Sequence, residues 1–484
     1  MTKHEIKAII DQTIKEFNKS PSFESSSAKG KSPAHACSTI HIGSANKWLC
    51  SDVEEAVHNA QRAQQVLLKS NLEDRARFIS AMRDASRLHA KSLAELAHTE
   101  TGYGSTAHKV LKNLLAADKT PGLEDLGTSA TSGDDGLTLV EMAPWGVIGS
   151  ITPSTNPTST IINNAISMIT AGNAVVFNPH PGAKRASQEA MRILNEAIKS
   201  AGGPETLLTT VNEPTLQTGN DIMKHPEIKL LSITGGEAVV AQAMKYPKRV
   251  IAAGPGNPPV IVDDSANIAY AAKCIVDGAS FDNNVLCVAE KEVFSFSNIT
   301  DELIKEMTEN QGAWLISGSD IDKVARTVLT EKEGVYAPNR NFVGRDASFI
   351  LKACGISFYS KPRLIIAEVP KDHPFVMTEM LLPVLPIVRV KDIDEAVENA
   401  IIAEKGNQHS AMIHSQLIGN LTYVATALDT TIFVKNAPSY SGLGFGGMGF
   451  TSLTISTPTG EGLTSARTFT RARRCVLKGD LRVV

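Results

Sequence analysis

The sequence lacks several features that mark whole classes of protein. Its 48 basic and 51 acidic residues leave a net charge of −3, which excludes a protein that works mainly by neutralising nucleic-acid phosphates. No uncharged apolar run approaches the roughly 18 residues that a membrane-spanning helix needs. The N-terminus has no uncharged apolar centre like that of a signal peptide, because Lys3, Glu5 and Lys7 interrupt it. We therefore expect a soluble, cytosolic protein with neither a nucleic-acid nor a membrane partner.

Cysteine is scarce as well. The chain of 484 residues has six cysteines and no CxxC spacing, so neither a disulfide framework nor a zinc module is expected. The spacing of His35, Cys37 and His41 resembles that of metal ligands, but flexible segments rarely hold a preformed site and no fourth ligand is apparent. We expect no metal. The six cysteines are Cys37, Cys50, Cys274, Cys287, Cys354 and Cys475.

Residues 1–18 carry an apolar stripe that predicts an amphipathic helix. The stripe consists of Ile6, Ile9, Ile10, Ile14 and Phe17. Residues 19–45 are rich in Ser, Pro, Lys and Gly and are typical of a flexible linker. Two interpretations are open. The tethered helix docks onto another protein, or it packs on its own domain or frays, since short isolated helices are marginal in water.

The segment that follows the linker has a helical pattern. It extends over residues 51–117, and Ser51 and Glu54 would form a capping box at its start. Residues 127–142 are polar and β-like, which suits a hairpin that leaves the main body. The tail from residue 451 is β-like and basic.

Strands and helices alternate twice in the rest of the chain, first over residues 147–253 and then over 260–432. Short apolar strands separated by helices predict parallel sheets covered on both faces, which is a doubly wound α/β fold. In the first stretch the predicted strands are 147–151, 174–177, 207–211, 229–233 and 250–253, and the predicted helices are 158–170, 183–200 and 237–245.

Two strand ends in the first stretch have unusual sequences. A doubly wound sheet binds ligands beyond the carboxyl ends of its strands. One strand runs into the rigid turn Asn178-Pro179-His180, and another enters a helix through Thr234-Gly235-Gly236. The second turn would direct backbone N–H groups and a helix dipole at a phosphate, although such turns also occur for their geometry alone.

A third glycine-rich segment, Gly442–Gly447, matches the dinucleotide fingerprint GxGxxG. The fingerprint must open a helix within a βαβ unit, whereas the residues that follow Gly447 are strand-like. We interpret this segment as a flexible loop near the active site.

Cys287 ends the polar turn Phe281–Cys287, between a predicted helix and the predicted strand 290–295. Such a turn could present a nucleophilic thiolate to a cleft. A buried cysteine is also often a small hydrophobic residue, so the local sequence leaves both roles open.

Several motifs in order along the chain resemble those of the aldehyde dehydrogenase superfamily, and in particular of its CoA-acylating branch. The motifs are Pro144–Thr158, Ala171–Pro181, Thr234–Gly236, the Cys287 segment, Thr378–Val384 and Gly406–Ala411. The resemblance extends over nearly everything after residue 46. It is strongest to the propionaldehyde and acetaldehyde dehydrogenases of bacterial microcompartments, whose N-terminal targeting helices resemble residues 3–17.

The resemblance implies a role for each matching residue of the reaction centre. Cys287 matches the nucleophile. Asn156 matches the amide that forms the oxyanion hole with the Cys287 N–H, and donors of this kind can each lower a barrier by about 3 kcal/mol. His409 lies in a family motif and is a candidate catalytic or CoA-site residue, although a histidine in this context could equally be a satisfied core residue.

The resemblance also implies an NAD site. Thr234, Gly235 and Gly236 match the turn under the pyrophosphate, and Glu379 matches the carboxylate that holds the nicotinamide ribose. Without the family, Glu379 would be interpreted as a solvated loop carboxylate. The Asn178-Pro179-His180 turn would contact the adenosine side, with Asn178 in place of the usual lysine.

The same resemblance implies an aldehyde dehydrogenase-like organisation of two doubly wound domains and a β oligomerisation arm. Residues 46–126 and 144–253 would form the NAD-binding domain, and 254–450 the catalytic domain. Residues 127–143 and 451–484 would form the arm and tail of a homodimer or homotetramer. As in the family, the β-like segments near 127–142 and 467–477 would pair and extend into a neighbouring subunit. Residues 1–18 would bind a shell protein, which places the enzyme in the lumen of a microcompartment in the bacterial cytoplasm.

One departure from the hydrolytic aldehyde dehydrogenases is informative. Ala252 stands where those enzymes carry the glutamate that activates water, so the acyl group would leave to a nucleophile such as the CoA thiol. The expected reaction is oxidation of propionaldehyde or acetaldehyde to acyl-CoA with NAD. The alternatives are a hydrolytic NAD(P)-dependent enzyme with another base, and a non-catalytic interaction protein, which the presence of Cys287 and Asn156 disfavours. The sequence does not determine whether acetaldehyde or propionaldehyde is preferred, or whether NAD or NADP is used. It also does not identify the base that deprotonates Cys287.

Overall fold

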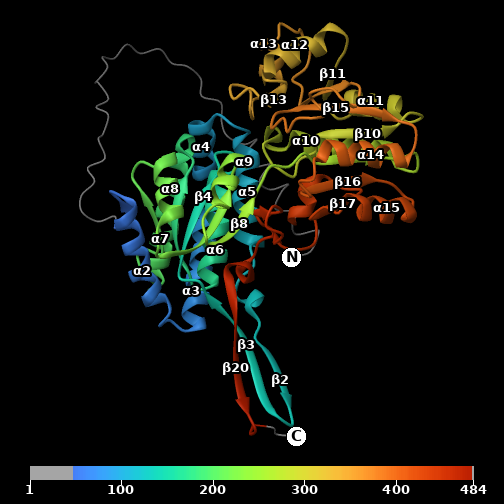
Figure 1. Ribbon diagram of the computed structural model, residues 1–484. Coiled ribbons are helices and arrows are strands. Elements are labelled where there is room, and N and C mark those ends of the chain that lie inside the picture. The colour runs from blue at the N-terminus through green and yellow to red at the C-terminus, as the bar shows by residue number, and fades with distance from the viewer. Residues whose placement is uncertain (1–46, 482–484) are drawn as a thin grey trace, which may run out of the picture. The chain divides into compact units, whose positions relative to one another are not determined.

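The computed structural model describes residues 47–481, in which two parallel sheets form the centre of the fold (Figure 1). The strands of the first sheet are β1 Leu49–Cys50, β4 Val147–Thr152, β5 Ala174–Pro179, β6 Leu208–Val211, β7 Ile228–Thr234 and β8 Arg249–Ala253. Their order is β1-β6-β5-β4-β7-β8, and every neighbouring pair is parallel. Strands β5 and β6 are buried along their whole length, as expected for a parallel sheet between two layers of helices.

Helices surround this first sheet. They are α2 Val53–Leu67, α3 Leu72–Leu88, α4 Ala90–Thr101, α5 Thr106–Lys119, α6 Pro157–Thr170, α7 Lys184–Ser200, α8 Leu216–Lys224 and α9 Glu237–Ala243. Helices α6 and α7 contact β5 and pack against α3, whereas α2 and α8 contact each other and β5. The connections through α6 and α7 run one way along the sheet and the one through α8 runs the other way, so right-handed crossovers place α8 on the opposite face. The predicted doubly wound arrangement is confirmed.

The second sheet has seven strands, all parallel to their neighbours. They are β9 Pro259–Val262, β10 Glu292–Phe296, β11 Ala313–Ile316, β14 Leu364–Glu368, β15 Val384–Val390, β16 Ser410–His414 and β17 Ile432–Lys435, in the order β11-β14-β15-β10-β9-β16-β17. The helices around it are α10 Ile268–Ser280, α11 Thr300–Glu309, α12 Ser319–Val328, α13 Ala347–Ala353, α14 Ile393–Glu404 and α15 Ile418–Leu428. A short hairpin of β12 Leu329–Lys332 and β13 Val335–Pro338 was not foreseen from the sequence.

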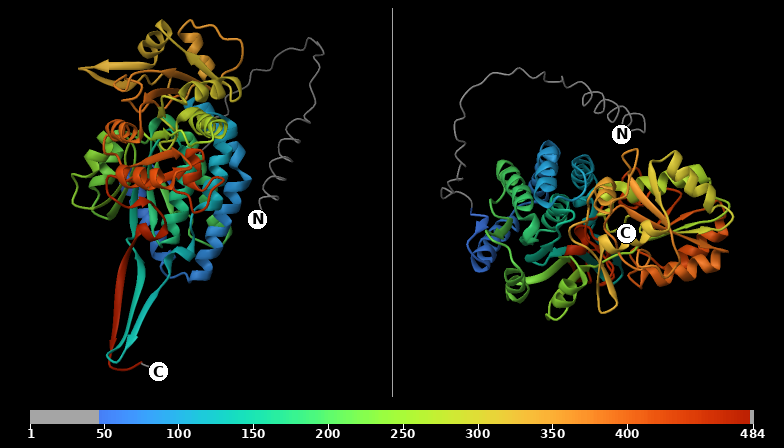
Figure 2. Two further views of the ribbon diagram at one scale, coloured as in Figure 1. Left: turned by 90° about the vertical axis from the view of Figure 1, so that its right-hand side faces the viewer. Right: turned by 90° about the horizontal axis from the view of Figure 1, so that it is seen from above.

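An antiparallel sheet of three strands projects from the two parallel sheets (Figures 1 and 2). It consists of β2 Ser129–Gly133, β3 Gly136–Pro144 and β20 Thr470–Lys478. Strand β20 pairs with β3 along its whole length, from Thr470 opposite Pro144 to Lys478 opposite Gly136. The expected pairing of the hairpin with the C-terminal tail is confirmed.

The start of α2 differs from the predicted capping box. The N-cap is Asp52, whose side chain accepts a hydrogen bond from the Glu55 N–H at 2.9 Å. The Glu55 carboxylate in turn accepts from the Ser51 N–H at 2.8 Å. The predicted capping box of Ser51 and Glu54 is therefore wrong by one residue, because aspartate caps a helix at least as well as serine.

The literal GxGxxG segment opens no helix. It overlaps a short 3₁₀ turn, Ser439–Leu443, and the next element is strand β18 Ile455–Ser456, which pairs with β19 Gly462–Leu463. Residues 46–484 form one compact unit, and the predicted domain bounds within it stay predictions. The predicted helix 1–18, the linker 19–45 and the His35-Cys37-His41 group lie outside the described residues. Within 47–481, no helix is long and apolar enough to cross a membrane.

Candidate active site

The strand order of the first sheet places a crevice between β4 and β7. The chain proceeds from β4 to β5 and β6 on one side and then crosses to β7 and β8 on the other, so the direction of winding changes between β4 and β7. Ligands of doubly wound sheets bind outside the carboxyl ends of the strands at such a point. The residues that follow these two strands line a cavity of about 550 Å³, within the usual range for a cofactor site.

The second sheet closes this cavity with the amino ends of its strands. His409 immediately precedes β16, Glu379 precedes β15, and Cys287 lies in the turn before β10, and all three line the cavity. The cavity therefore lies between the carboxyl edge of one sheet and the amino edge of the other. It brings together all ten residues singled out from the sequence, namely Asn156, Asn178, Pro179, His180, Thr234, Gly235, Gly236, Cys287, Glu379 and His409.

The turn before Cys287 has an unusual backbone. Asp282, Asn283 and Asn284 have φ angles of 48°, 55° and 67°, so three successive residues adopt the left-handed conformation. Asn and Asp tolerate this conformation better than other non-glycine residues. Side-chain hydrogen bonds hold the turn, because the Asn283 amide donates to Gly344 O at 2.9 Å and the Asn284 amide donates to Ala279 O at 2.8 Å.

The environment of Cys287 favours the protonated thiol. Burial and, to a smaller extent, the charge of Glu379 raise the pKa of this thiol to about 12, against the opposing effect of the Lys291 ammonium. Burial likewise raises the pKa of Glu379 to about 7, against the opposing effect of Lys291. A carboxylate with a pKa near 7 is well matched to general base chemistry at neutral pH. Among the described residues 47–481 that line the cavity, Glu379 is the only acidic one.

Lys291 is a residue of the site that the sequence did not reveal. Its side chain is only 1% exposed, and its ammonium donates to the Asn284 side-chain oxygen at 2.7 Å and to Leu286 O at 2.9 Å. The ammonium therefore holds the turn that carries Cys287 and lowers the pKa of the thiol. In the sequence, Lys291 stands between Glu290 and Glu292 and resembles a residue of a solvated strand face.

His409 lines the cavity but is only 1% exposed. Its Nδ1 lies 2.8 Å from the Ser410 hydroxyl, and its backbone N–H donates to Glu404 at 3.0 Å. Burial lowers the pKa of His409 to about 4, so the ring is neutral at neutral pH. A Cβ on Gly256 would lie only 2.8 Å from the ring, so this glycine allows the close packing.

The Thr234–Gly236 turn lines another part of the cavity. A Cβ on Gly236 would meet no atom within 4 Å, so the backbone there is open, and the Thr234 hydroxyl lies 2.8 Å from that of Thr454. The Asn178 amide is tied to α8, because it accepts from the Thr218 hydroxyl at 2.7 Å and donates to Thr215 O at 3.2 Å. Asn178 thus shapes the wall of the cavity through its own hydrogen bonds.

Ala252 lies on β8 and is fully buried, with its N–H donating to the Thr459 hydroxyl at 3.0 Å. The next two residues, Ala253 and Gly254, line the cavity, whereas Ala252 does not. Strand β8 therefore brings no carboxylate to the cavity.

The sequence matches the aldehyde dehydrogenase family over residues 24–464. It is 52% identical to an acetaldehyde dehydrogenase (acetylating) of Bilophila wadsworthia, over 89% of this chain and 90% of that protein. It is 47% identical to a propanal dehydrogenase (CoA-propanoylating) of Salmonella typhimurium, over 89% of this chain and 92% of that protein.

Solved structures agree with these relatives. A propionaldehyde dehydrogenase from the fucose utilisation microcompartment of Clostridium phytofermentans has a TM-score of 0.88 and 48% identity, over 90% of this chain and 100% of that one. A Rhodopseudomonas palustris propionaldehyde dehydrogenase, solved with bound CoA and an acylated cysteine, has a TM-score of 0.87 and 45% identity, over 90% and 99% of the two chains. This chain therefore belongs to the aldehyde dehydrogenase family, among relatives that acylate CoA.

Proposed function

We propose that this protein oxidises a short-chain aldehyde, propionaldehyde or acetaldehyde, to the acyl-CoA with reduction of NAD. The observation that carries the proposal is the single cavity shared by Cys287, Asn156 and the Thr234–Gly236 turn. Relatives named for this chemistry are 47% to 52% identical to the chain. The cavity thus offers a nucleophile, a donor for an oxyanion and an open turn for a dinucleotide.

Cys287 carries the covalent chemistry in this proposal. The sulfur, once deprotonated, bonds to the aldehyde carbon, and the carbonyl π electrons move to the oxygen. The Asn156 amide and the Cys287 N–H bind that oxyanion. When bound, NAD accepts the hydride from the same carbon and the CoA thiol accepts the acyl group. As the hydride leaves, the oxyanion electrons re-form the carbonyl, so that Cys287 holds the acyl group as a thioester. The incoming thiol then displaces Cys287, and the departing Cys287 sulfur takes up the proton that the incoming thiol gives up.

The other lining residues hold the cofactors in this proposal. Thr234, Gly235 and Gly236 lie under the pyrophosphate, and Glu379 accepts hydrogen bonds from the nicotinamide ribose. The Asn178-Pro179-His180 turn lies at the adenosine side. His409 contributes to the CoA or reaction end, where its neutral ring accepts or donates a hydrogen bond. Residues 46–126 with 144–253 bind NAD, and residues 254–450 carry Cys287.

The experiment that tests the proposal is NADH formation at 340 nm from propionaldehyde and NAD⁺, with and without CoA. Sustained turnover only with CoA supports it, and a single burst without CoA would report the acyl-enzyme directly. Sustained turnover without CoA would indicate hydrolysis, with Glu379 as the candidate base. Absence of NADH under both conditions would favour an interaction protein. Cys287→Ala, which lacks the proposed nucleophile, is the negative control.

We also infer how the enzyme assembles. The exposed arm of β2, β3 and β20 joins copies of the chain into a homodimer or homotetramer. Residues 1–18 bind a shell protein and hold the enzyme in the lumen of a bacterial microcompartment. Supporting this, β20 is an exposed edge strand, and solved relatives come from a microcompartment.

A further inference from the structure

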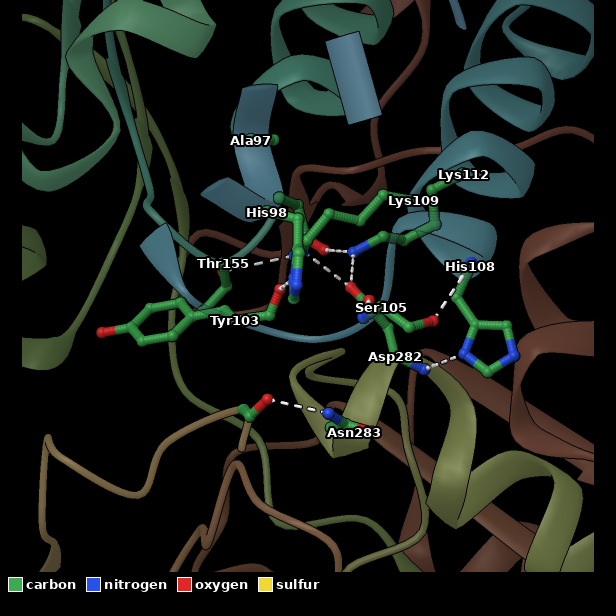
Figure 3. Close-up of polar contacts among 12 residues, drawn as sticks. Ala97, His98, Tyr103, Ser105, His108, Lys109, Lys112, Thr155, Asp282 and Asn283 are labelled. Atoms are coloured by element: carbon green, nitrogen blue, oxygen red, sulfur yellow. Dashed lines mark hydrogen bonds and ion pairs between the residues drawn. The ribbon is translucent and has the colours of Figure 1, made fainter. Parts of the chain in front are cut away.

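Figure 3 shows a cluster of buried charges formed by α5 and the turn before Cys287. Lys109 and Lys112 project from α5, and their ammonium groups converge on the carboxylate of Asp282. The side chains are 3%, 4% and 0% exposed, in that order. Lys109 Nζ lies 3.0 Å from Asp282 Oδ2, and Lys112 Nζ binds the same oxygen. Buried charges are costly unless they are paired, so this cluster requires an explanation.

The surroundings hold the Asp282 carboxylate in one place. Its Oδ1 accepts from the Ser105 N–H at 2.8 Å, and its own N–H donates to His108 Nδ1 at 2.8 Å. A Cβ on Gly104 would lie 1.9 Å from Oδ1, so only glycine permits this approach. Burial raises the pKa of Asp282, but the two ammonium groups outweigh it and hold the pKa below its ordinary value. The carboxylate is therefore ionised and fixed.

Lys112 has a second partner in the proposed oxyanion hole. Its ammonium donates to Asn156 Oδ1 at 2.6 Å. An ammonium has no acceptor, so it fixes which end of the Asn156 amide faces it. The Nδ2 end instead donates to the Thr155 hydroxyl at 3.3 Å, and both Asn156 and Thr155 line the cavity. Lys112 thereby turns the donor end of Asn156 away from α5.

The cluster of Lys109, Lys112 and Asp282 connects the turn that carries Cys287 to the segment that carries Asn156. Asp282 opens the left-handed turn and comes five residues before Cys287. Asn156 follows β4 and begins α6. Lys112 contacts both, and two lysines against one carboxylate leave a net positive charge next to the Asn156 side chain.

We propose that Lys112 is a positioning residue of the oxyanion hole, which orients the Asn156 amide and couples it through Asp282 to the turn that carries Cys287. The inference rests on the proposed function, since it assigns Lys112 to the same reaction. It predicts that the loss of Lys112 weakens oxyanion binding in the transition state and leaves aldehyde binding in the ground state nearly unchanged.

The test compares Lys112→Met with Lys109→Met in the full chain. Both variants remove one buried ammonium from Asp282, but only Lys112 contacts Asn156. We expect Lys112→Met to lower kcat about 100-fold with KM for propionaldehyde within about threefold, and Lys109→Met to lower kcat by less than about fivefold. Thermal unfolding would record the stability lost in each. Equal effects of the two variants on kcat would overturn the inference.

A second comparison separates this inference from the proposed function. In an Asn156→Ala background, Lys112→Met should lower kcat by no more than about threefold, because the group that it positions is gone. A full 100-fold loss in that background would overturn the inference alone. If Asn156→Ala itself left kcat unchanged, the proposed oxyanion hole would be wrong. Should Lys112→Met not fold, Lys112→Gln against Lys109→Gln provides the same comparison with side chains that can still form hydrogen bonds.

Discussion

Glu379 is the cavity residue whose charge changes in the neutral pH range. Its pKa is about 7, because burial raises it and the ammonium of Lys291 only partly opposes the rise. Below pH 7 the carboxyl group is mostly protonated, and above pH 7 it is a carboxylate that accepts hydrogen bonds with both oxygens. Charge-assisted hydrogen bonds are stronger than neutral ones. If Glu379 holds the nicotinamide ribose, NADH should bind more tightly as pH rises through 7.

The expected result is a Kd for NADH that falls up to about tenfold between pH 6 and pH 8, which corresponds to about 1.4 kcal/mol. NADH fluorescence titration measures it without turnover, so ionisation of the CoA and Cys287 thiols does not enter. Glu379→Gln keeps the size of the side chain and removes its titration, so its Kd should not change with pH. The same pH dependence in Glu379→Gln would assign the effect to another group.

At the scale of a single element, the left-handed turn before Cys287 leads to a specific prediction about the stability of Asn283 variants. Asn283 has a φ of 55°, and its amide donates to Gly344 O and to Asp346, each at 2.9 Å. Both Asn283→Ala and Asn283→Gly lose these hydrogen bonds. Only alanine also carries the conformational free-energy cost of a positive φ angle, because glycine has no Cβ. We expect alanine to lower the free energy of unfolding by about 1 kcal/mol more than glycine. Urea unfolding measures the difference, and equal losses would show that the backbone angle is not the constraint.

The strands could be predicted from the sequence because they are apolar on both faces. The predicted strand 174–177 lies within β5 Ala174–Pro179, and the predicted strand 229–233 lies within β7 Ile228–Thr234. The turns that follow them were identified because glycine and proline mark such places. The left-handed turn of Asp282–Asn284 had only a weak signal, namely three successive Asp and Asn residues.

The buried cluster could not be predicted in the same way. Lys109 and Lys112 are three residues apart on an amphipathic helix, and such a pair normally forms a solvated face. Their partner Asp282 lies 170 residues beyond Lys112, and no local pattern reports a contact of that range. Without the family resemblance Glu379 shows the same limit, because its loop is unremarkable until the fold brings its carboxylate within electrostatic range of the Lys291 ammonium.

At the scale of the whole molecule, the arm is the surface best suited to join two copies. Strand β20 lies at one edge of a three-stranded sheet, is exposed over most of its length, and presents Val476 with 63% exposure. Long exposed edge strands are usually paired or covered. We expect Val476→Asp to shift the protein to a smaller species in size-exclusion chromatography with light scattering. Leu88→Asp, an equal change at a 79% exposed site on α3, is the control. An unchanged mass in Val476→Asp would contradict a role for this part of the arm.

Residues 1–18 allow the location of the enzyme to be tested separately from its catalytic activity. The described residues 47–481 belong to one compact unit, and residues 1–18 lie outside the residues that the structure describes. If this helix serves only to dock on a shell, its removal should leave CoA-dependent NADH formation unchanged and abolish co-sedimentation with co-expressed microcompartment shells. Ile10→Glu should have the same effect, because it places a charge within the apolar stripe, whereas Lys7→Glu on the opposite face should not. A truncated chain that lost its fold would make the helix part of the enzyme, and one that still reached the shell would place the docking surface on residues 46–484.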